Sequence, residues 1–317
     1  MLVAKVYGDS DKGLVRTNNE DAFIAQKVWD DSHWLLAVVD GLGGYEGGEV
    51  AASIAQKNIL QTVKEMKGKD CLDAIMQSVV DANNAIFNQR NSKASLNNMG
   101  CVVTAAILDL EKKQLNIAHV GDTRLYLYDS NGLSKLTHDH SFVGALEDEG
   151  RISEEDAMNH PRRNLIDRIV GDELKEIETP RFIEAAVFPV SKGNQYLLCS
   201  DGLSDMLTSS EINLVLQKGI NVKKKVGQFI ETTNKKGGKD NVTVIVASID
   251  SGQVKRNIKR DNLPVQVRKQ KNRKKKHNYM QPPPSNESVD SFYKIVLIAM
   301  IIILLVLFVV FLIHAKL

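Results

Sequence analysis

The chain has 317 residues, of which 43% are hydrophobic and 25% are charged. This composition is typical of a protein that folds around a core, and it excludes a fully disordered chain, a collagen and a small disulfide scaffold. Residues 255–317 carry 13 Lys/Arg and 3 Asp/Glu, whereas the formal net charge of the whole chain is only +2. An acidic body of residues 1–254 is therefore joined to a basic tail.

The body predicts an antiparallel α+β architecture. Two segments, at about 47–66 and 70–90, space their apolar residues at helical intervals. Short apolar runs bounded by turn residues predict strands at 2–8, 22–29, 33–39, 101–109, 114–120, 123–129, 181–188, 195–199 and 242–249. Strands follow one another in groups instead of alternating strictly with helices, which disfavours a doubly wound parallel sheet. The three cysteines, Cys71, Cys101 and Cys199, form no close pair in the sequence and predict no disulfide framework.

Six carboxylates fall at the ends of the expected strands. Asp40 and Asp201 directly follow buried strands. The other four precede strands: Glu20, Asp21, Asp122 and Asp240. Because the end of one antiparallel strand lies beside the start of its neighbour, all six side chains can gather at one rim of the sheets.

Crowded carboxylates repel one another unless cations neutralise them, and a set of oxygen ligands suits Mg²⁺, Mn²⁺ or Ca²⁺. No His or Cys stands at these positions, which disfavours zinc. The alternative is that each Asp is an ordinary turn residue. Glycine beside Asp40, Asp122 and Asp201 favours a metal site for the set, because glycine lets backbone approach closely.

Residues 40–49, DGLGGYEGGE, lie between a buried strand and a helix and indicate a loop that can cradle phosphate. The loop lacks the Lys-Ser/Thr pair of a P-loop and the spacing of a dinucleotide fingerprint. Arg16, four residues before Glu20, offers a guanidinium fork suited to phosphate oxygens. Taken alone, Arg16 is more readily explained as an ordinary surface arginine.

Five segments, taken together and in order, resemble the metal-dependent serine/threonine phosphatases of the protein phosphatase 2C type (PPM family), in their compact bacterial form. They are RTNNED (16–21), VVDGLGG (38–44), HVGDTRLYL (119–127), CSDGLSD (199–205) and DNVTVIV (240–246). The resemblance covers nearly all of residues 1–250, which we expect to form the phosphatase domain. It implies a β-sandwich of two antiparallel sheets flanked by helices on both outer faces (αββα), with metals at one end.

The resemblance also implies roles for individual residues. Asp40 would bridge two Mg²⁺ or Mn²⁺ ions, and the Gly41 carbonyl would join it on one of them. Glu20 would act there mainly through metal-bound water, while Asp201 and Asp240 would hold the other ion.

Asp122, together with Asp201, would bind a third and weaker ion. Arg16 matches the arginine that binds the phosphate. Asp21 and Asn241 are expected to orient water or backbone around the ligands. The implied reaction is direct hydrolysis by a water shared between two ions, with no phosphoenzyme.

One position departs from the pattern of the animal enzymes, which have His two residues after the bridging Asp. Here that residue is Leu42, so the group that protonates the leaving alkoxide is left open. Residues 141–172 fall where the family has a mobile flap. Within them Arg162 and Arg163 place cations where a phosphoprotein can dock, although a solvated loop is an equal alternative.

The tail predicts a membrane tether. Ile295 to Ile313 is an unbroken apolar run of 19 residues, and we expect a transmembrane helix at 294–314 behind a basic, proline-containing linker at 251–293. The alternative is a buried core helix. The excess of basic residues before the span predicts that the body lies in the cytoplasm. We therefore expect a single-pass C-terminal anchor in the cell (inner) membrane. The run RKQKNRKKK also resembles a nucleic-acid arm, but beside a membrane helix it favours anionic lipid.

The sequence thus predicts a membrane-tethered Mg²⁺/Mn²⁺-dependent phosphatase that acts on phosphoserine and phosphothreonine in proteins and opposes a Ser/Thr kinase, with no nucleic-acid partner. Two alternatives belong to other classes. One is a catalytically silent phosphatase fold that binds partners at the membrane, although the five expected acidic ligands are all retained. The other is a divalent-metal nuclease, which would use the basic run to attract RNA or DNA.

Overall fold

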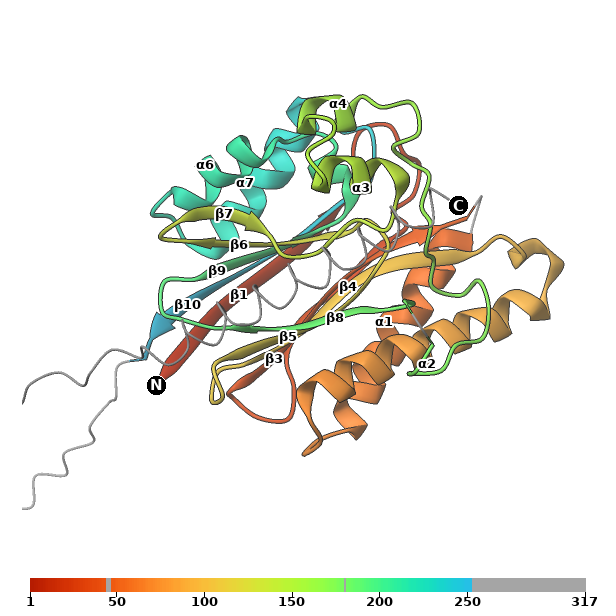
Figure 1. The fold of residues 1–317 in the computed structure, drawn as a ribbon, viewed down its shortest axis with the longest axis horizontal. Coiled ribbons are helices and arrows are strands. Elements are labelled where there is room, and N and C mark those ends of the chain that lie inside the picture. Colours follow the sequence, from red (N-terminus) through yellow and green to blue (C-terminus); the bar gives the residue numbers. More distant parts are fainter. Residues whose placement is uncertain (44–46, 180, 253–317) are drawn as a thin grey trace, which may run out of the picture. The chain divides into compact units, whose positions relative to one another are not determined.

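The computed structural model describes residues 1–43, 47–179 and 181–252 (Figure 1). Within them the strands form two five-stranded antiparallel sheets. The first sheet has the order β1 (Leu2–Asp11), β10 (Val242–Ser251), β9 (Gln195–Cys199), β6 (Arg124–Asp129) and β7 (Gly132–Lys135). The second has the order β2 (Asp21–Lys27), β3 (His33–Leu42), β4 (Gly100–Asp109), β5 (Gln114–Val120) and β8 (Glu184–Pro189).

Helices cover the outer face of each sheet (Figure 1). Helices α1 (Gly47–Glu65) and α2 (Cys71–Ser92) pack on the second sheet, and α6 (Ser209–Gln217) and α7 (Val222–Lys235) pack on the first. Three shorter helices are α3 (Phe142–Asp148), α4 (Glu154–Met158) and α5 (Asp201–Ser204). A 3₁₀ turn, η1 (Ala94–Leu96), follows α2. The predicted αββα sandwich is confirmed.

Strand β3 shows why a continuous apolar run builds the centre of this sandwich. Its side chains alternate between two cores, as the two-residue period of a strand requires. Leu36 and Val38 pack between the two sheets, whereas Leu35 and Val39 face α1 and α2. Residues 35–39 are all fully buried, so the strand needs apolar side chains on both faces.

The strand register brings distant segments to one rim. In the second sheet Asp21, at the start of β2, pairs with Asp40 near the end of β3. In the first sheet Cys199, the last residue of β9, pairs with Val244 on one side and Arg124 on the other. The end of β9 therefore lies beside the starts of β10 and β6, as the positions of the carboxylates predict.

Helices α6 and α7 were not predicted, and the strands differ from the predicted elements in several places. The short strand β7 was not predicted; it pairs with β6 through the turn at Ser130 and Asn131. Strand β8 begins at Glu184 instead of residue 181, because Arg181 has a φ of 58°, which no strand residue adopts. All three cysteines are free and buried, as the absence of a disulfide framework predicts.

The predicted linker at 251–293, apart from Ser251 and Gly252, and the predicted transmembrane helix at 294–314 lie outside the described residues. Within the described part of the chain, no helix combines the length and the apolar character that a membrane span requires.

Candidate active site

A cavity of about 380 Å³ opens at the rim where the strand ends meet. It is lined by eight of the residues that the sequence predicts for the site: Arg16, Glu20, Asp40, Gly41, Asp122, Asp201, Asp240 and Asn241. Leu42, Asn164 and Ile166 complete part of its wall. The eight predicted residues come from five separate stretches of the chain, so only the folded sandwich assembles them.

The loop before β2 carries Arg16 and Glu20, and Asn241 fastens this loop to the start of β10. The Asn241 side-chain oxygen accepts a hydrogen bond from the Glu20 amide at 2.8 Å. Its amide nitrogen donates to the carbonyl oxygens of Lys12 and Asn18 at 3.0 and 2.9 Å. Asn241 thus holds the backbone of this loop in place, and it also lines the cavity.

Asp40 and Gly41 stand near the end of β3, where backbone packs too closely for any side chain. A Cβ added at Gly41 would lie 2.2 Å from the carbonyl oxygen of Gly48. One added at Gly48 would lie 2.8 Å from the Glu20 carboxyl carbon. The two glycines are therefore needed where α1, β3 and the Glu20 side chain converge.

Asp201 begins α5 directly after β9. The next residue, Gly202, lies against the start of β10, because an added Cβ would meet the Asn241 carbonyl oxygen at 1.9 Å. Ser200 connects the two sheets at this point: its hydroxyl donates to Asp21 Oδ2 at 2.8 Å. Asp21 is not among the residues that line the cavity, and the Ser200 hydroxyl holds its carboxylate.

Burial and mutual repulsion dominate the electrostatics of the rim. Burial, followed by the charges of Asp21 and Asp201, raises the pKa of Asp40 well above its usual range. Burial, followed by the charges of Asp122 and Asp205, does the same to the pKa of Asp201. None of the main influences on these two groups favours the charged form.

Burial also raises the pKa values of two neighbouring carboxyl groups, those of Asp122 and Asp21. Burial raises the pKa of Asp122 to about 7, with further contributions from Asp139 and Asp205. Burial also raises the pKa of Asp21 to about 6, although hydrogen bonds from Ser200 and Thr243 oppose the shift. A set of carboxylates that repel one another around one cavity fits divalent ions with oxygen ligands, because such ions remove the repulsion.

Arg16 is the cation on the cavity wall. Its Nη2 lies 2.7 Å from Asp240 Oδ2, and its side chain is 48% exposed. Burial lowers the pKa of Arg16, but the hydrogen bond and charge of Asp240, together with the charges of Glu20 and Asp201, outweigh burial and raise the pKa. The guanidinium is therefore charged and fixed at one nitrogen, and about half of the Arg16 side chain is open to solvent.

Asp205 is a neighbour of the site that the sequence analysis missed. It ends α5, four residues after Asp201, and lines two smaller cavities together with Asp201. Burial raises its pKa, and Arg163 opposes the shift. Helical spacing was the available signal, because residues i and i+4 share one face of a helix.

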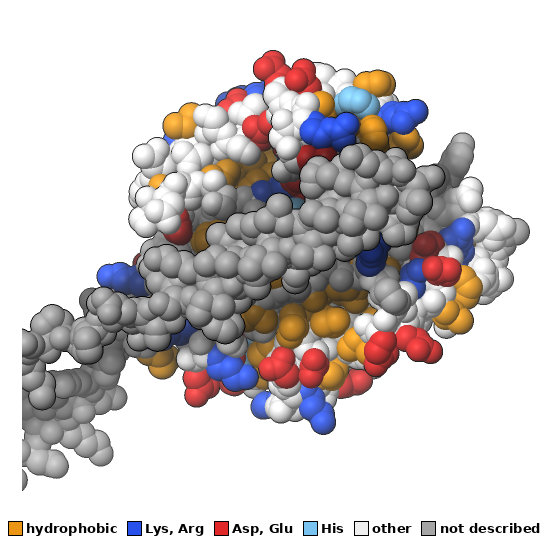
Figure 2. All heavy atoms as spheres, in the orientation of Figure 1, with side chains coloured by type: hydrophobic (Ala, Val, Ile, Leu, Met, Phe, Trp, Pro, Cys, Tyr) orange, Lys and Arg blue, Asp and Glu red, His pale blue; other side chains and the backbone are white. Residues whose placement is uncertain are grey.

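The predicted flap lies beside the cavity. Ser153 and Asp156 form a capping box at the start of α4. Arg163 Nε donates to Asp205 Oδ2 at 3.1 Å, so this cation is directed to α5. Arg162 stays exposed, with its guanidinium carbon 5.8 Å from the centre of the Phe142 ring. Figure 2 shows acidic, basic and hydrophobic side chains mixed on the surface over α3 and α4.

No histidine lines the cavity among the described residues. Leu42 occupies the position where the animal enzymes have one. His119 is fully buried: burial lowers its pKa to about 4, and its ring nitrogens contact Thr104 Oγ1 and the His138 carbonyl oxygen. Among the described residues, no imidazole therefore lies where it could protonate the leaving alkoxide.

The comparisons with known proteins agree with this geometry. The family model for protein phosphatase 2C matches residues 15–245. The chain belongs to the protein phosphatase 2C family. Serine/threonine phosphatase stp of Listeria welshimeri is 36% identical over 243 residues, which cover 75% of this chain and 92% of that protein.

PstP of Mycobacterium tuberculosis is 38% identical over 256 residues, which cover 80% of this chain but only 47% of PstP. This protein phosphatase 2C chain therefore matches about half the length of that relative. The crystal structure of the M. tuberculosis phosphatase superposes with a TM-score of 0.69 at 36% identity, covering 78% of this chain and all of the other. A PstP catalytic domain in complex with two manganese ions gives 0.68 at 34% identity.

Proposed function

We propose that this protein is a membrane-tethered, Mg²⁺- or Mn²⁺-dependent phosphatase that hydrolyses phosphoserine and phosphothreonine in proteins. The observation that carries the proposal is the rim cavity, where the Arg16 guanidinium lies beside five carboxylates. Charge of both signs in one cavity suits a phosphate held between an arginine and metal ions.

Asp40 and the Gly41 carbonyl would hold one divalent ion, with Glu20 acting through water. Asp40 would share a second ion with Asp201 and Asp240. When bound, the two ions would supply Lewis acidity and an activated water for direct attack on phosphorus. The two manganese ions in complex with the PstP catalytic domain support this assignment by family likeness.

The chain's own residues would bind and orient the phosphate. Arg16 would balance charge on the phosphoryl oxygens through the guanidinium nitrogens that Asp240 leaves free. Asn241 would keep the Arg16 loop in register with β10. Ser200 would hold Asp21 so that its carboxylate does not turn toward the ligands. These contacts keep the site in place before substrate arrives.

Asp122 and Asp201 would hold a third and weaker ion. Asp205 stands close enough to raise the pKa of both carboxyl groups, so we add it to this site. The flap arginines Arg162 and Arg163 would face a phosphoprotein. The names of the relatives support a protein substrate, and a Ser/Thr kinase would supply it.

The tail would fix the enzyme to the cytoplasmic face of the cell membrane. The sequence features that support this are the apolar run at 295–313 and the 11 Lys/Arg between Lys255 and Lys276, which suit anionic lipid. The retained acidic ligands disfavour the catalytically silent alternative.

Turnover tests the proposal directly. The purified full-length chain in detergent should hydrolyse p-nitrophenyl phosphate and a phosphothreonine peptide when Mn²⁺ is present, and chelator should stop both reactions. Asp40→Asn should remove turnover of both substrates while the protein remains folded by circular dichroism. Activity that survives chelation or either Asp40→Asn or Asp201→Asn would overturn the mechanism, and a folded but inactive wild-type protein would favour the silent alternative.

A further inference from the structure

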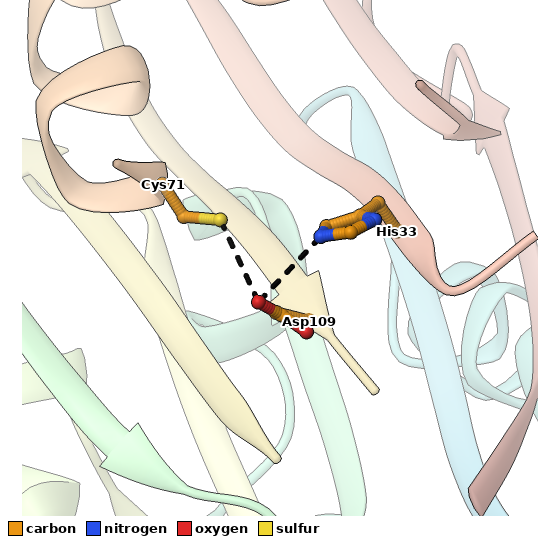
Figure 3. Close-up of side chains that lie close together, drawn as sticks. All are labelled: His33, Cys71 and Asp109. Atoms are coloured by element: carbon orange, nitrogen blue, oxygen red, sulfur yellow. Dashed lines mark hydrogen bonds and ion pairs between the residues drawn. The ribbon is translucent and has the colours of Figure 1, made fainter. Parts of the chain in front are cut away.

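A second cluster of potential ligands lies at the opposite end of β3 from Asp40. His33 is the first residue of β3, and the register pairs it with Asp109, the last residue of β4. Cys71, the first residue of α2, reaches the same point from the helix layer. Figure 3 shows the Cys71 thiol and the His33 ring both directed at Asp109. At about 3.3 Å per residue, seven residues of β3 separate this cluster from the rim by about 23 Å.

The distances suit one small ion. Asp109 Oδ2 lies 3.9 Å from Cys71 Sγ and 3.5 Å from His33 Nε2, and the three ligand atoms all lie within 4.8 Å of one another. A tetrahedral zinc ion at ordinary bond lengths separates sulfur from oxygen by about 3.6 Å and nitrogen from oxygen by about 3.4 Å. Movements of a few tenths of an ångström would therefore bring Asp109 and each partner to coordination distance.

The surroundings of His33 prepare its Nε2 to bind an ion. His33 Nδ1 lies 2.8 Å from Asp30 Oδ1, so Nδ1 carries the proton and donates it to the carboxylate. In the neutral ring Nε2 then has a lone pair, and that lone pair faces the Asp109 oxygen. Two acceptors facing each other need a proton or a cation between them. A carboxylate behind a histidine is also the usual support of a metal-binding imidazole.

Within the described part of the chain, only one of the two Asp109 carboxylate oxygens accepts hydrogen bonds from backbone amides. Asp109 Oδ1 accepts hydrogen bonds from the amides of Glu111 and Lys112 at 2.9 and 2.8 Å, which leaves Oδ2 directed at Cys71 and His33. Asp109 is 1% exposed and Cys71 3%, whereas the His33 side chain is 13% exposed and offers a route for an ion. A buried carboxylate with only a thiol and an imidazole at one oxygen fits a cation at that place.

The chemistry favours ligation over catalysis by the thiol. Burial, followed by the charge of Asp109, raises the pKa of Cys71 to about 11, so the free thiol is a poor nucleophile at neutral pH. A second cluster, His119, His140 and Glu184, offers a contrast. Both ring nitrogens of His119 already have partners there, which leaves no free lone pair for an ion.

We propose that Cys71, His33 and Asp109 form a binding site for zinc or a similar soft divalent ion, separate from the phosphatase centre. Binding would replace the thiol proton of Cys71 with a sulfur–metal bond and release that proton to solvent. The fourth position would be taken by water, since three protein ligands leave it open. The ion would join the first turn of α2 to the ends of β3 and β4.

Cobalt provides the test, because a cobalt–thiolate bond gives a charge-transfer absorption that oxygen ligands do not. The full-length chain, reduced and stripped of metal, should develop this absorption as Co²⁺ is titrated in, with one thiolate-bound Co²⁺ per chain at saturation, and Zn²⁺ should abolish it. Cys71→Ser should lose the absorption. Asp40→Asn is the matched control: it should keep the absorption although it disables the rim. The outcome is thus independent of whether the proposed phosphatase activity is found.

A second variant keeps the test decisive if the Cys71→Ser protein loses the absorption only because it misfolds. Asp30→Asn keeps all three ligands but weakens the support of His33, so the Co²⁺ Kd should rise about 10- to 100-fold. Zn²⁺ should also raise the Tm of the wild-type chain more than that of either variant. An absent absorption in the wild type, or one that persists in Cys71→Ser, would show that the three side chains are only hydrogen-bonded. An unchanged Kd in Asp30→Asn would likewise overturn the role of Asp30.

Discussion

Arg16 Nη2 and Asp240 Oδ2 lie 2.7 Å apart across the mouth of the rim cavity, although the two residues are far apart in the sequence. This ion pair joins the candidate phosphate-binding cation to a candidate metal ligand. It fixes one nitrogen of the guanidinium and leaves the rest of the fork for a phosphate. Binding of substrate and binding of metal are therefore expected to be coupled through this pair.

Arg16→Ala should lower kcat/KM for a phosphothreonine peptide about 10- to 100-fold, because a hydrogen bond to a charged group contributes about 1.5–3 kcal/mol. Arg16→Lys should recover part of the loss, since it keeps the charge without the fork. Steady-state kinetics at saturating Mn²⁺ measures both variants. An Arg16→Ala protein with wild-type KM and kcat would exclude a role for Arg16 in phosphate binding.

Asp40→Asn should stabilise the metal-free protein, because it removes one of several repelling charges. The folded-state pKa of Asp40 is raised, so the folded protein holds its proton more tightly than the unfolded chain. The stability from that proton is fully present below the unfolded pKa of about 3.9 and is lost as the pH rises through the folded value. The gain in unfolding free energy, about 1–3 kcal/mol, should thus grow with rising pH.

Urea unfolding in the presence of chelator at a series of pH values measures this difference. Saturating Mn²⁺ should reverse the order, because the wild-type protein keeps the Asp40 ligand, binds the ion more tightly and is therefore stabilised more. A variant that is less stable than the wild type in chelator at every pH would contradict the repulsion argument.

Asp205→Asn should weaken the binding of the proposed third ion and leave the binding of the two tighter ions unchanged. Asp205 caps the C-terminal end of the helix that begins at Asp201, and it contributes to the raised pKa of Asp122. Calorimetric titration with Mn²⁺ should show about a tenfold weaker last step. If all binding steps keep their wild-type Kd, Asp205 does not belong to the metal site.

The two flap arginines should behave differently. Arg162 is exposed, so Arg162→Ala should raise KM for a phosphoprotein severalfold and leave p-nitrophenyl phosphate unaffected. Arg163 pairs with Asp205, so Arg163→Ala should disturb both substrates and the weak metal step. Kinetics with the two substrates in parallel separates these effects. Equal losses on both substrates for Arg162→Ala would remove its role in docking.

Deletion of residues 290–317 should release the protein from membranes, because the deletion removes the apolar run. Turnover of a soluble phosphopeptide should stay within about twofold of the full chain, since the rim residues all lie before residue 242. Fractionation of cell membranes measures the first effect and steady-state kinetics the second. A truncated protein that still sediments with membranes would contradict the tether.

The sequence alone determined the architecture and most of the rim. Apolar runs with turn residues at their ends predicted every long strand, because the two-residue period of a strand is written in neighbouring positions. The carboxylates at strand ends predicted the cavity for a similar reason: antiparallel pairing places the end of one strand beside the start of the next. Asp40 and Asp21, paired in the register, are the clearest example.

Only the tertiary structure decided which distant groups meet and which charges they acquire. No local pattern indicates that Arg163 contacts Asp205, or that Cys71 of α2 lies against Asp109 of β4. Such contacts depend on how a helix packs on a sheet, which the packing of many side chains settles together. The raised pKa values at the rim have the same origin, since burial and the proximity of other carboxylates exist only in the folded chain.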